Sequence, residues 1–416
     1  MAEQHGKALV PQIRFAGFTD PWEQRKLSEL VEIERGGSPR PIERYITDDP
    51  CGLNWVKIGD APELGRYITQ TAEKIKPEGL AKTRQVYPGD LVLSNSMSFG
   101  RPYIMAIKGC IHDGWLLIRD AQKHFDPIFL CHMLGAPQML NQYRMFAAGS
   151  TVNNLNKELV GKAIVSLPSK DEQREIGIVL DRLDSLITLH QRKYDKLCVL
   201  KKSMLDKMFP KGGSLYPEIR FAGFTDPWEQ RKLGEIATFG GGHTPSMSDS
   251  DNYEGGNVLW VTSQDVKSHY LDGTTTQITE KGAKELTLYP AGSLVMVTRS
   301  GILRHTLPVA ELRKPSTVNQ DIRVILPQGK YYGQWLLQFF ISRNKELLLE
   351  FGKTGTTVES VDFSKMRDMV LLTPSLPEQQ QIGHYFARLD NLITLHQRKL
   401  ELLRNIKKSM LDKMFV

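Results

Sequence analysis

The chain has 416 residues, 40% hydrophobic and 24% charged, so it is long enough for two to four domains and too apolar for a disordered chain. Its 54 Lys and Arg against 47 Asp and Glu give a net charge of +7, which fits a nucleic-acid partner without requiring one. The four cysteines lack C-x-x-C spacing, and no apolar run approaches the roughly 18–20 residues of a membrane span. The first residues also lack the apolar segment of a secretory signal. We therefore expect a reduced, cytoplasmic protein without a zinc ribbon or other metal site, and with no membrane partner.

The chain is a tandem repeat with an offset of 206 residues, in which several blocks recur almost unchanged. These blocks are PQIRFAGFTDPWEQRKL at 11–27 and PEIRFAGFTDPWEQRKL at 217–233, RLDSLITLHQRK at 182–193 and RLDNLITLHQRK at 388–399, and KKSMLDKMF at 201–209 and 407–415. The inserts at 31–148 and 237–354 have diverged and share only landmarks, such as GGSP at 36–39 against GHTP at 242–245, and GSTV at 149–152 against GTTV at 355–358. Drift alone would erode blocks and inserts equally. The pattern therefore favours one scaffold that presents two different surfaces.

In chain order, the first copy predicts short strands at 54–58, 90–94 and 115–119 and a helix at 127–140. The second copy predicts strands at 258–262, 293–298 and 322–326 and a helix at 332–349. Gly, Pro and Asp cluster between these runs, as turns require. We expect a mixed α/β fold with six segments in tandem pseudo-twofold order. They are an N-terminal frame segment (1–30), an α/β domain (31–168), a central helix (169–210), a repeat of the frame segment (211–236), a second α/β domain (237–374) and a distal helix (375–416).

The two long helices have apolar residues spaced 4-3-4-3, the heptad rule of a coiled-coil seam. About 40 residues at about 1.5 Å each predict a rod near 60 Å, and two rods in one chain pack most simply as an antiparallel pair. The same seam also contains His190, His396, Lys201 and Lys407. We interpret the histidines as helix-pairing residues, whereas each lysine can either set the register or extend its charged end to solvent. The predicted apolar seam residues are Ile176, Leu180, Leu183, Ile187, Leu197, Ile382, Phe386, Leu389, Ile393, Leu400 and Leu403.

The last nineteen residues of each helix, 191–209 and 397–415, carry six Lys or Arg against two acids. This excess is explained equally well by a solvated basic face and by a face that docks a partner.

Each insert carries polar and basic residues on predicted loops. Arg, Asn and Gln pair bidentately with guanine and adenine edges, and Lys suits phosphate oxygens. An ordinary solvated loop would carry similar residues, so the alternative stays open for each one. The candidate DNA-binding residues are Arg40, Arg44, Lys57, Asn95 and Arg101 in the first copy, and Gln264, Arg299, Arg304, His305, Asn319 and Gln320 in the second.

Catalytic motifs are missing from the sequence. Gly352-Lys353-Thr354 resembles the end of a phosphate loop, but Leu347 stands where that motif needs a glycine. There is no Gly-x-Ser-x-Gly elbow, no Asn/Asp-Pro-Pro-Tyr/Phe tetrad and no glycine-rich loop suited to a methyl-donor nucleotide. We therefore expect no catalytic residues and no enzymatic activity in this chain.

The repeated blocks resemble the specificity subunit of type I restriction–modification systems over nearly the whole chain. The resemblance is carried by IRFAGFTDPWEQRKLGEI at 219–236, GGHTPS at 241–246, GTTVESV at 355–361, PSLPEQQQIG at 374–383 and LDNLITLHQRK at 389–399. The first copy departs at Gly37-Ser38-Pro39 and in SKDEQREI at 169–176. The resemblance implies two target-recognition domains on double-stranded DNA, spaced by an antiparallel coiled coil. It also implies two modification subunits, which use S-adenosylmethionine for adenine-N6 methylation, and two restriction subunits, which use ATP and Mg. The chain itself would need no cofactor.

The repeat itself agrees with this resemblance. A pseudo-twofold chain matches two half-sites about one helical turn apart, and different inserts imply an asymmetric DNA site. Two alternatives remain: a single-chain DNA methyltransferase or nuclease, which the missing motifs oppose, and a coiled-coil scaffold whose inserts bind protein. The recognised bases and the spacer length cannot be derived from the sequence. The near-identical blocks also suggest that inserts are exchanged between gene copies by recombination.

Overall fold

The computed structural model describes residues 10–95, 100–147, 155–355 and 358–416. The GSTV landmark at 149–152 and two residues of its counterpart, 356–357, lie outside them. The described chain forms two compact units: unit 1 comprises Met1–Lys193 with His396–Val416, and unit 2 comprises Tyr194–Leu395. The units are therefore not the two repeat copies, because each one takes in the C-terminal end of the other copy's long helix.

Unit 1 is built on two five-stranded sheets. One has the order β2-β11-β8-β9-β5, with β2 Glu32–Arg35, β5 Tyr67–Ile68, β8 Leu91–Ser94, β9 Pro102–Met105 and β11 Trp115–Arg119. The other has the order β3-β6-β4-β10-β7, with β3 Ile46–Thr47, β4 Leu53–Val56, β6 Glu73–Ile75, β7 Arg84–Val86 and β10 Gly109–Ile111. The antiparallel pair β1 Glu23–Lys26 and β12 Ile164–Leu167 completes the strands, and the helices are α1 Pro127–Leu134, α2 Pro137–Ala147, α3 Lys157–Gly161 and the first part of α4.

Unit 2 repeats this plan with changes. Its five-stranded sheet has the order β14-β21-β18-β19-β16, with β14 Ala237–Gly240, β16 Tyr270–Leu271, β18 Leu294–Val297, β19 Val309–Leu312 and β21 Ile322–Pro327. The smaller sheet is β17-β15-β20, with β15 Val258–Val261, β17 Gln277–Ile278 and β20 Thr317–Val318. The remaining elements are the pairs β13 Glu229–Lys232 with β24 Val370–Thr373 and β22 Gly352–Lys353 with β23 Ser360–Val361, and the helices α5 Leu233–Ile236, α6 Glu280–Ala283, α7 Gly333–Ser342, α8 Asn344–Phe351 and α9 Phe363–Arg367.

All six predicted strands are present, and the mixed α/β fold class is confirmed. The central strands β8 and β18 are buried on both faces, which explains their continuous apolar runs. The two predicted domain helices are each broken into two. In the first copy α1 ends before Gly135, and α2 begins at Pro137, which cannot continue a helix from within. In the second copy the break falls at Arg343, between α7 and α8.

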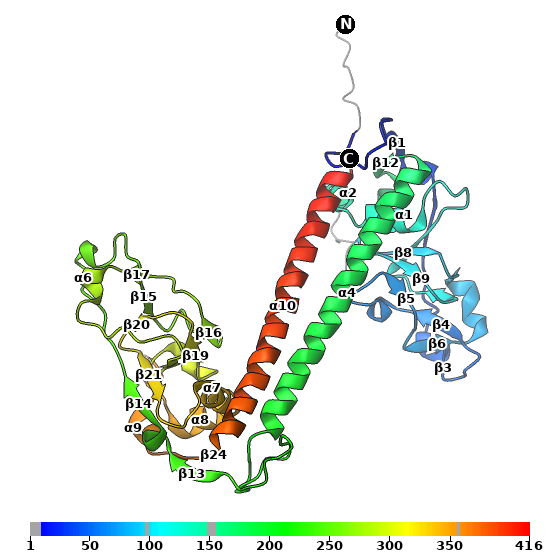
Figure 1. Cartoon of the computed structure of the whole chain (residues 1–416). Helices are drawn as coiled ribbons and strands as arrows, with labels where there is room; N and C mark the ends of the chain where they lie inside the picture. Colours follow the sequence, from blue (N-terminus) through cyan, green and yellow to red (C-terminus); the bar gives the residue numbers. More distant parts are fainter. Residues whose placement is uncertain (1–9, 96–99, 148–154, 356–357) are drawn as a thin grey trace. The chain divides into compact units, whose positions relative to one another are not determined.

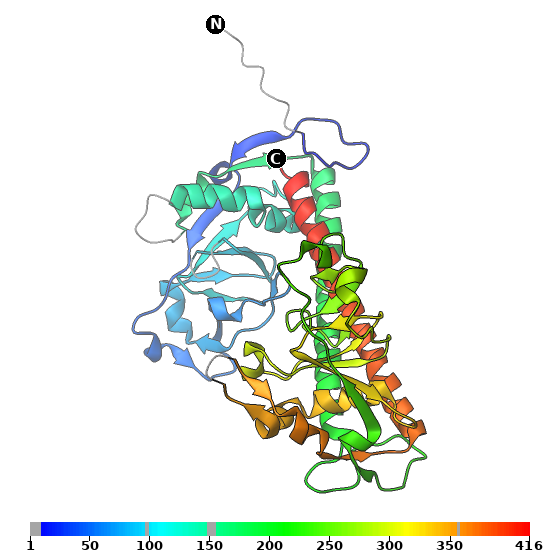
Figure 2. The ribbon, with the colours of Figure 1, turned by 90° about the vertical axis from the view of Figure 1, so that its left-hand side faces the viewer.

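The two long helices are α4 Lys170–Lys207 and α10 Leu376–Met414. In unit 1 the first part of α4 lies beside the end of α10 (Figure 1, Figure 2). The unit 1 core accordingly joins Ile176 and Leu180 of α4 with Met414 and Phe415. Unit 2 mirrors this, because Met208 and Phe209, which follow α4, enter a core with residues from the start of α10.

Equivalent ion pairs connect the helices inside each unit. Lys407 of α10 pairs with Asp184 of α4 in unit 1, and Lys201 of α4 pairs with Asp390 of α10 in unit 2. An apolar seam tolerates sliding, whereas a charged pair at one level fixes the register. The antiparallel arrangement of the two long helices, expected from their heptads, is thus observed within each unit.

The repeated frame blocks meet at the start of each long helix. In unit 1 the Arg14 guanidinium donates two hydrogen bonds to Glu172, whose side chain is almost fully buried. In unit 2 Arg220 makes the same pair with Glu378. Such a pair between residues 158 positions apart needs both partners, because a lone buried carboxylate is costly. This geometry accounts for the near-identity of blocks that are distant in sequence.

The glutamine that follows each buried glutamate joins the long helix to the domain. Gln173 accepts a hydrogen bond from the backbone of Asp126, which caps α1, and donates to the Pro168 carbonyl. In the second copy Gln379 accepts from the backbone of Tyr332, before α7, and donates to Pro374. The Glu-Gln pair that opens each predicted helix therefore connects it to its own domain.

None of the helices that the structure describes is at once long and apolar enough to span a bilayer.

Candidate nucleic-acid interface

One edge of unit 2 gathers most of the second-copy candidates. Strands β15 and β20 pair in parallel, so their carboxyl ends open at the same edge. Gln264 follows β15 and Gln320 follows β20, and both side chains are exposed. The adjoining β18 ends beside them, because Thr298 donates its backbone N–H to the Asp321 carbonyl at 2.8 Å. Arg299 comes next and is exposed. The fold thus brings three separate candidates to one exposed, polar edge.

Arg304 and His305 extend this surface. Arg304 closes the short 3-10 helix Gly301–Arg304, and its guanidinium pairs with Glu359. Hydrogen bonding from Arg304 holds the pKa of the Glu359 carboxyl below its usual range. Because the Ser300 backbone donates to the Glu359 carbonyl at 3.1 Å, the pair lies directly beside the end of β18. His305 is exposed next to it.

The same edge of unit 1 carries different groups. Strands β4 and β10 pair in parallel, and Lys57 follows the first while His112 and Asp113 follow the second. Lys57 pairs with Glu73. The exposed Arg40 guanidinium lies 3.8 Å from the Asp113 carboxylate. Unit 1 therefore has Lys57, Arg40 and the acidic Asp113 at the strand edge where unit 2 has Gln264 and Gln320.

The remaining first-copy candidates lie elsewhere or point inward. Arg44 is exposed in the 3-10 helix that follows Arg40. Arg101 precedes β9, donates to the Glu63 carbonyl at 2.6 Å and stacks over the Tyr103 ring at 5.1 Å. It lies in a different part of unit 1, described below.

Asn95 and Asn319 have internal roles in the structure. Asn95 is 3% exposed, and its amide donates to the Asp113 carbonyl at 2.9 Å. Asn319 is 6% exposed, and its amide group bonds Asp321 within the same turn. These bonds hold neighbouring loops, so both amides have a structural role, and DNA binding by either residue stays a prediction. The sequence could not separate them from exposed amides, since burial depends on distant strands.

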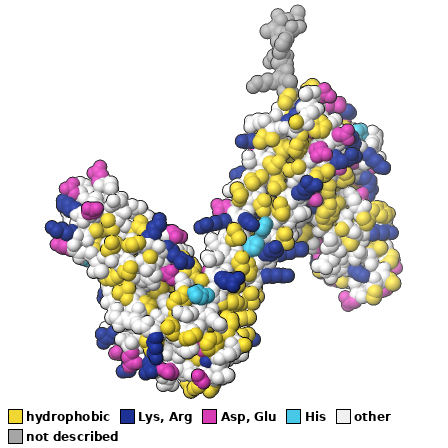
Figure 3. Space-filling model, in the orientation of Figure 1, with side chains coloured by type: hydrophobic (Ala, Val, Ile, Leu, Met, Phe, Trp, Pro, Cys, Tyr) yellow, Lys and Arg dark blue, Asp and Glu magenta, His cyan; other side chains and the backbone are white. Residues whose placement is uncertain are grey.

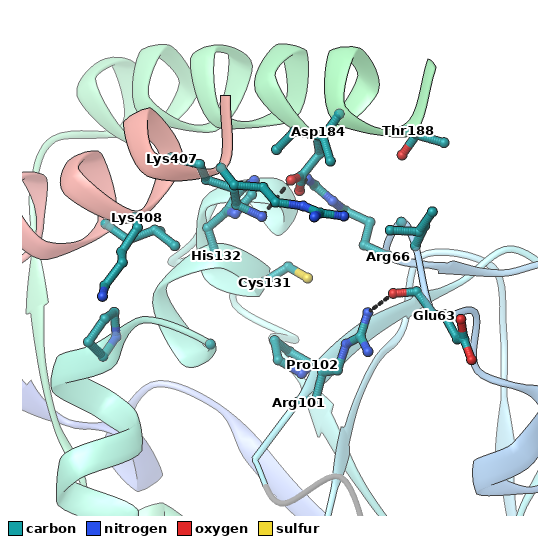
Figure 4. Close-up of a pocket in the computed structure, with 17 residues that line it drawn as sticks. Glu63, Arg66, Arg101, Pro102, Cys131, His132, Asp184, Thr188, Lys407 and Lys408 are labelled. Carbon is teal, nitrogen blue, oxygen red and sulfur yellow. Dashed lines mark hydrogen bonds and ion pairs between the residues drawn. The ribbon is translucent and has the colours of Figure 1, made fainter. Parts of the chain in front are cut away.

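Unit 1 also contains a cavity of about 410 Å³ where the domain meets both long helices. Figure 4 shows Lys407 and Arg66 converging on Asp184 and Arg101 reaching the Glu63 carbonyl. Five basic residues line the cavity against two acidic ones, so its charge is positive; they are Arg66, Arg101, Arg404, Lys407 and Lys408, against Glu63 and Asp184. Such a cavity attracts phosphate oxygens.

His132 forms part of the same cavity wall. Its side chain is 6% exposed, and the buried Nε2 atom has no hydrogen-bond partner. Burial, followed by the charges of Arg66 and Lys407, lowers the pKa of His132 to about 2. The imidazole is therefore neutral, and the positive charge of the cavity comes from the Lys and Arg side chains.

The predicted seam residues divide between two kinds of packing. None of them is exposed. Ile176 and Leu180 pack into the unit 1 core, and Ile382, Phe386 and Leu389 pack into that of unit 2. Leu183 and Leu197 are partly buried against these cores, while Ile187 and Leu400 are buried and Ile393 and Leu403 partly buried farther along the helices. The early part of each seam thus contacts its own domain as well as the other helix.

Sequence reasoning missed His112 and Asp113. His112 accepts from the Gly114 backbone through Nδ1, and its Nε2 atom lies 2.9 Å from Asp113 Oδ1. The sequence signal that could have located them is the glycine-rich landmark at 36–39, which aligns with 242–245 and packs against this strand end. A side chain on Gly36 would meet the His112 carbonyl at 2.2 Å, so only glycine lets this loop approach the strand end. Within the described residues, no three His, Cys, Asp or Glu side chains are grouped to hold a metal ion.

Comparisons with known proteins agree with this architecture. The family model of the type I restriction modification DNA specificity domain matches twice, at residues 19–198 and 225–405. A type I restriction enzyme specificity subunit from Escherichia coli is 30% identical over 191 residues, 43% of this chain and 47% of that protein. The chain thus spans about half the length of this relative. A second such subunit, from Methanocaldococcus jannaschii, is 21% identical over 94% of this chain and 92% of its own length.

A solved structure shares the fold at low sequence identity. The crystal structure of a type I restriction-modification system S subunit from M. genitalium has a TM-score of 0.59 and 14% identity, and it covers 98% of this chain and 99% of its own. The two family matches together cover most of the 416 residues. The predicted resemblance to this family is therefore confirmed. The chain belongs to the family of type I restriction modification DNA specificity domains.

Proposed function

We propose that this chain is the DNA-recognition subunit of a type I restriction–modification complex. Each α/β domain reads one half of an asymmetric, bipartite double-stranded DNA site. The observation that carries the proposal is the equivalent strand edge of the two units, which has the same backbone frame but different exposed groups. A shared frame gives both domains the same way of approaching DNA, and different side chains give different half-sites. The linear boundaries 31–168 and 237–374 are proposed as the extents of the two target-recognition domains.

The exposed candidates supply the two kinds of contact that a sequence reader needs. Arg40, Gln264, Arg299, Gln320 and their neighbours suit base edges, because their side chains carry donors and acceptors at exposed strand ends. Lys57 and the basic cavity of unit 1 suit phosphates, which position a protein without reading sequence. The net charge of +7 is modest, which favours DNA held together with partner subunits over strong binding by the chain alone.

The long helices are proposed to set the spacing and to dock modification subunits. Exposed leucines recur at the same positions in both copies: Leu186 and Leu189 in α4, and Leu392 and Leu395 in α10, each 43–47% exposed. Figure 3 shows hydrophobic side chains gathered along α4 and α10. Exposed apolar residues in rows on a helix favour a protein partner. Two equivalent rows in one chain support two copies of one partner.

The partners carry the chemistry in this proposal. Two modification subunits use S-adenosylmethionine to methylate adenine N6, and two restriction subunits use ATP and Mg for cleavage. The chain holds no cofactor of its own. The missing catalytic motifs support this division against a single-chain methyltransferase or nuclease. The polar strand edges favour DNA reading over a purely protein-binding scaffold.

A genome-wide map of N6-methyladenine tests the proposal. Cells that express the chain with its modification subunit are compared with cells that lack the chain. We expect a two-part asymmetric motif with a fixed gap only when the chain is present, and exchange of residues 31–148 should change one half of that motif. Absence of any chain-dependent motif, while the same modification subunit works with another specificity subunit, would refute DNA reading by these domains.

A further inference from the structure

The two domains carry different side chains at one equivalent position. Asp113 is the second residue after β10, and Gln320 is the second residue after β20, strands that pair in parallel with β4 and β15. The residue before each makes the same backbone bond. His112 donates to the last carbonyl of β4 at 3.1 Å, and Asn319 donates to the last carbonyl of β15 at 2.9 Å. Asp113 and Gln320 therefore occupy matching places at the candidate DNA-reading edge.

A hydroxyl group holds both side chains in the same way. Ser38 donates to Asp113 Oδ1 at 3.0 Å, and Thr244 donates to Gln320 Oε1 at 2.7 Å. Both hydroxyls belong to the glycine-rich landmark, as its third residue in each copy, and they stand 206 residues apart. The scaffold therefore fixes one oxygen of each side chain and leaves the other end of the group free to face outward. What differs is chemistry: a carboxylate that only accepts, against an amide that also donates.

Arg40 is the second part of the difference. It follows Ser38 by two residues, and the matching residue of the second copy is Ser246. The Arg40 side chain is 83% exposed, with a guanidinium nitrogen 3.8 Å from Asp113 Oδ2. That distance is too long for a hydrogen bond, so the carboxylate orients the guanidinium by charge and leaves its N–H donors free. Asp113 is itself held in place, because Ser38 donates to its other oxygen and the His112 ring nitrogen Nε2 lies 2.9 Å from that oxygen.

We propose that Arg40, oriented by Asp113, reads a guanine in the half-site of the first domain. We propose equally that Gln320 reads an adenine at the matching position of the other half-site. A guanidinium with free donors matches the O6 and N7 acceptors of guanine. The Gln320 amide keeps both N–H donors and one acceptor lone pair after its bond with Thr244, which matches adenine N7 and N6. The inference rests on the proposed function and adds which residues make the half-sites differ; Asp113 is a positioning residue.

Selection from random DNA tests this inference. The full chain in complex with its modification subunit selects duplexes from a randomised pool, and the bound fraction is sequenced. Four proteins are compared: wild type, Arg40→Ser, Asp113→Asn and the double variant Arg40→Ser with Asp113→Gln, which installs the second-copy pair. Arg144→Ser is the matched control, because it removes the same charge from an exposed helix position on α2. Thermal unfolding confirms that every variant is folded.

Wild type is expected to enrich a bipartite motif with a guanine in the first half. Arg40→Ser should lower the preference for that guanine by roughly 5- to 150-fold, the discrimination of one bidentate contact, and leave the second half unchanged. Asp113→Asn should lower it less, because Arg40 remains but loses its orienting charge. The double variant should shift the preference toward adenine at that one position.

Two other outcomes separate the inference from the proposed function. A bipartite wild-type motif that Arg40→Ser leaves unaltered, or weakens evenly at all positions, overturns the role of Arg40 in base reading while the proposed function stands. A wild type that enriches no bipartite motif refutes the proposed function, and the inference falls with it. A guanine preference that Arg144→Ser reduces as much as Arg40→Ser does would trace the effect to general charge and also overturn the inference.

Discussion

Truncation of the Phe415 side chain is expected to damage the first-copy domain, although the residue is second from the end of the chain. Phe415 is 7% exposed, and its ring lies 5.4 Å from that of Phe129 in α1. Loss of a buried Phe side chain costs about 3–5 kcal/mol. The lower figure, about 3 kcal/mol, is taken for Phe415→Ala as a minimum. A loss of about 3 kcal/mol should lower the melting temperature of a unit of this size by about 6–12 °C.

Hydrogen exchange resolved by peptide is the assay. Phe415→Ala should lower the protection of α1 and β11 in unit 1 and leave β18 and β21 of unit 2 unchanged. The matched variant is Phe209→Ala, since Phe209 stands 206 residues earlier and is buried against Trp228 and Phe386 in unit 2. It should produce the reverse pattern. If Phe415→Ala instead weakens unit 2, or both units equally, then the end of α10 does not belong to unit 1 and the assignment of each helix end to the other copy's unit is wrong.

Three further predictions concern charged and titratable groups. Burial, with smaller contributions from lysine charges and, for His396, from His190, lowers the pKa of His190 and His396, whose Nδ1 atoms lie 2.8 Å apart in unit 1. The unfolded chain therefore binds more protons than the folded chain below about pH 6.5, so stability decreases as the pH is lowered through this range. A variant with leucine at both positions should reduce the difference in stability between pH 7 and pH 5 in denaturant titrations. Arg220→Ala leaves the fully buried Glu378 unpaired and should cost about 3–5 kcal/mol, seen as lost exchange protection in unit 2, whereas the double variant Arg220→Met with Glu378→Leu should recover most of it; equal instability of both variants would contradict the pairing argument. Lys408→Gln, in the basic cavity of unit 1, should reduce the slope of log affinity against log salt by about 0.9 without changing the selected motif, and an unchanged slope would remove this cavity from the DNA contact.

The sequence by itself determined the repeat, the fold class and the two long helices. Their starts and ends follow from Pro168 and Pro374 and from the heptad spacing, which are local signals. The central strands were equally readable, since a short apolar run between turn residues leaves few alternatives. Local signals also identified which loops carry polar groups at strand ends. The prediction of one continuous helix in each domain was wrong. Gly135 and Pro137 interrupt the first-copy helix, and the second-copy helix is interrupted at Arg343.

Only the tertiary structure decided what each buried face contacts. Heptad spacing indicates that Ile176 and Leu180 are buried, but not that they share one core with residues of α1 and of the other long helix. Nor does it show that Phe415 packs against Phe129, which precedes it by about 290 residues in the sequence. The physical reason is that periodicity reports which side of an element avoids water, whereas the partner depends on chain segments brought together by folding. The same reason turned Asn95 and Asn319 inward and placed Asp113 beside Arg40.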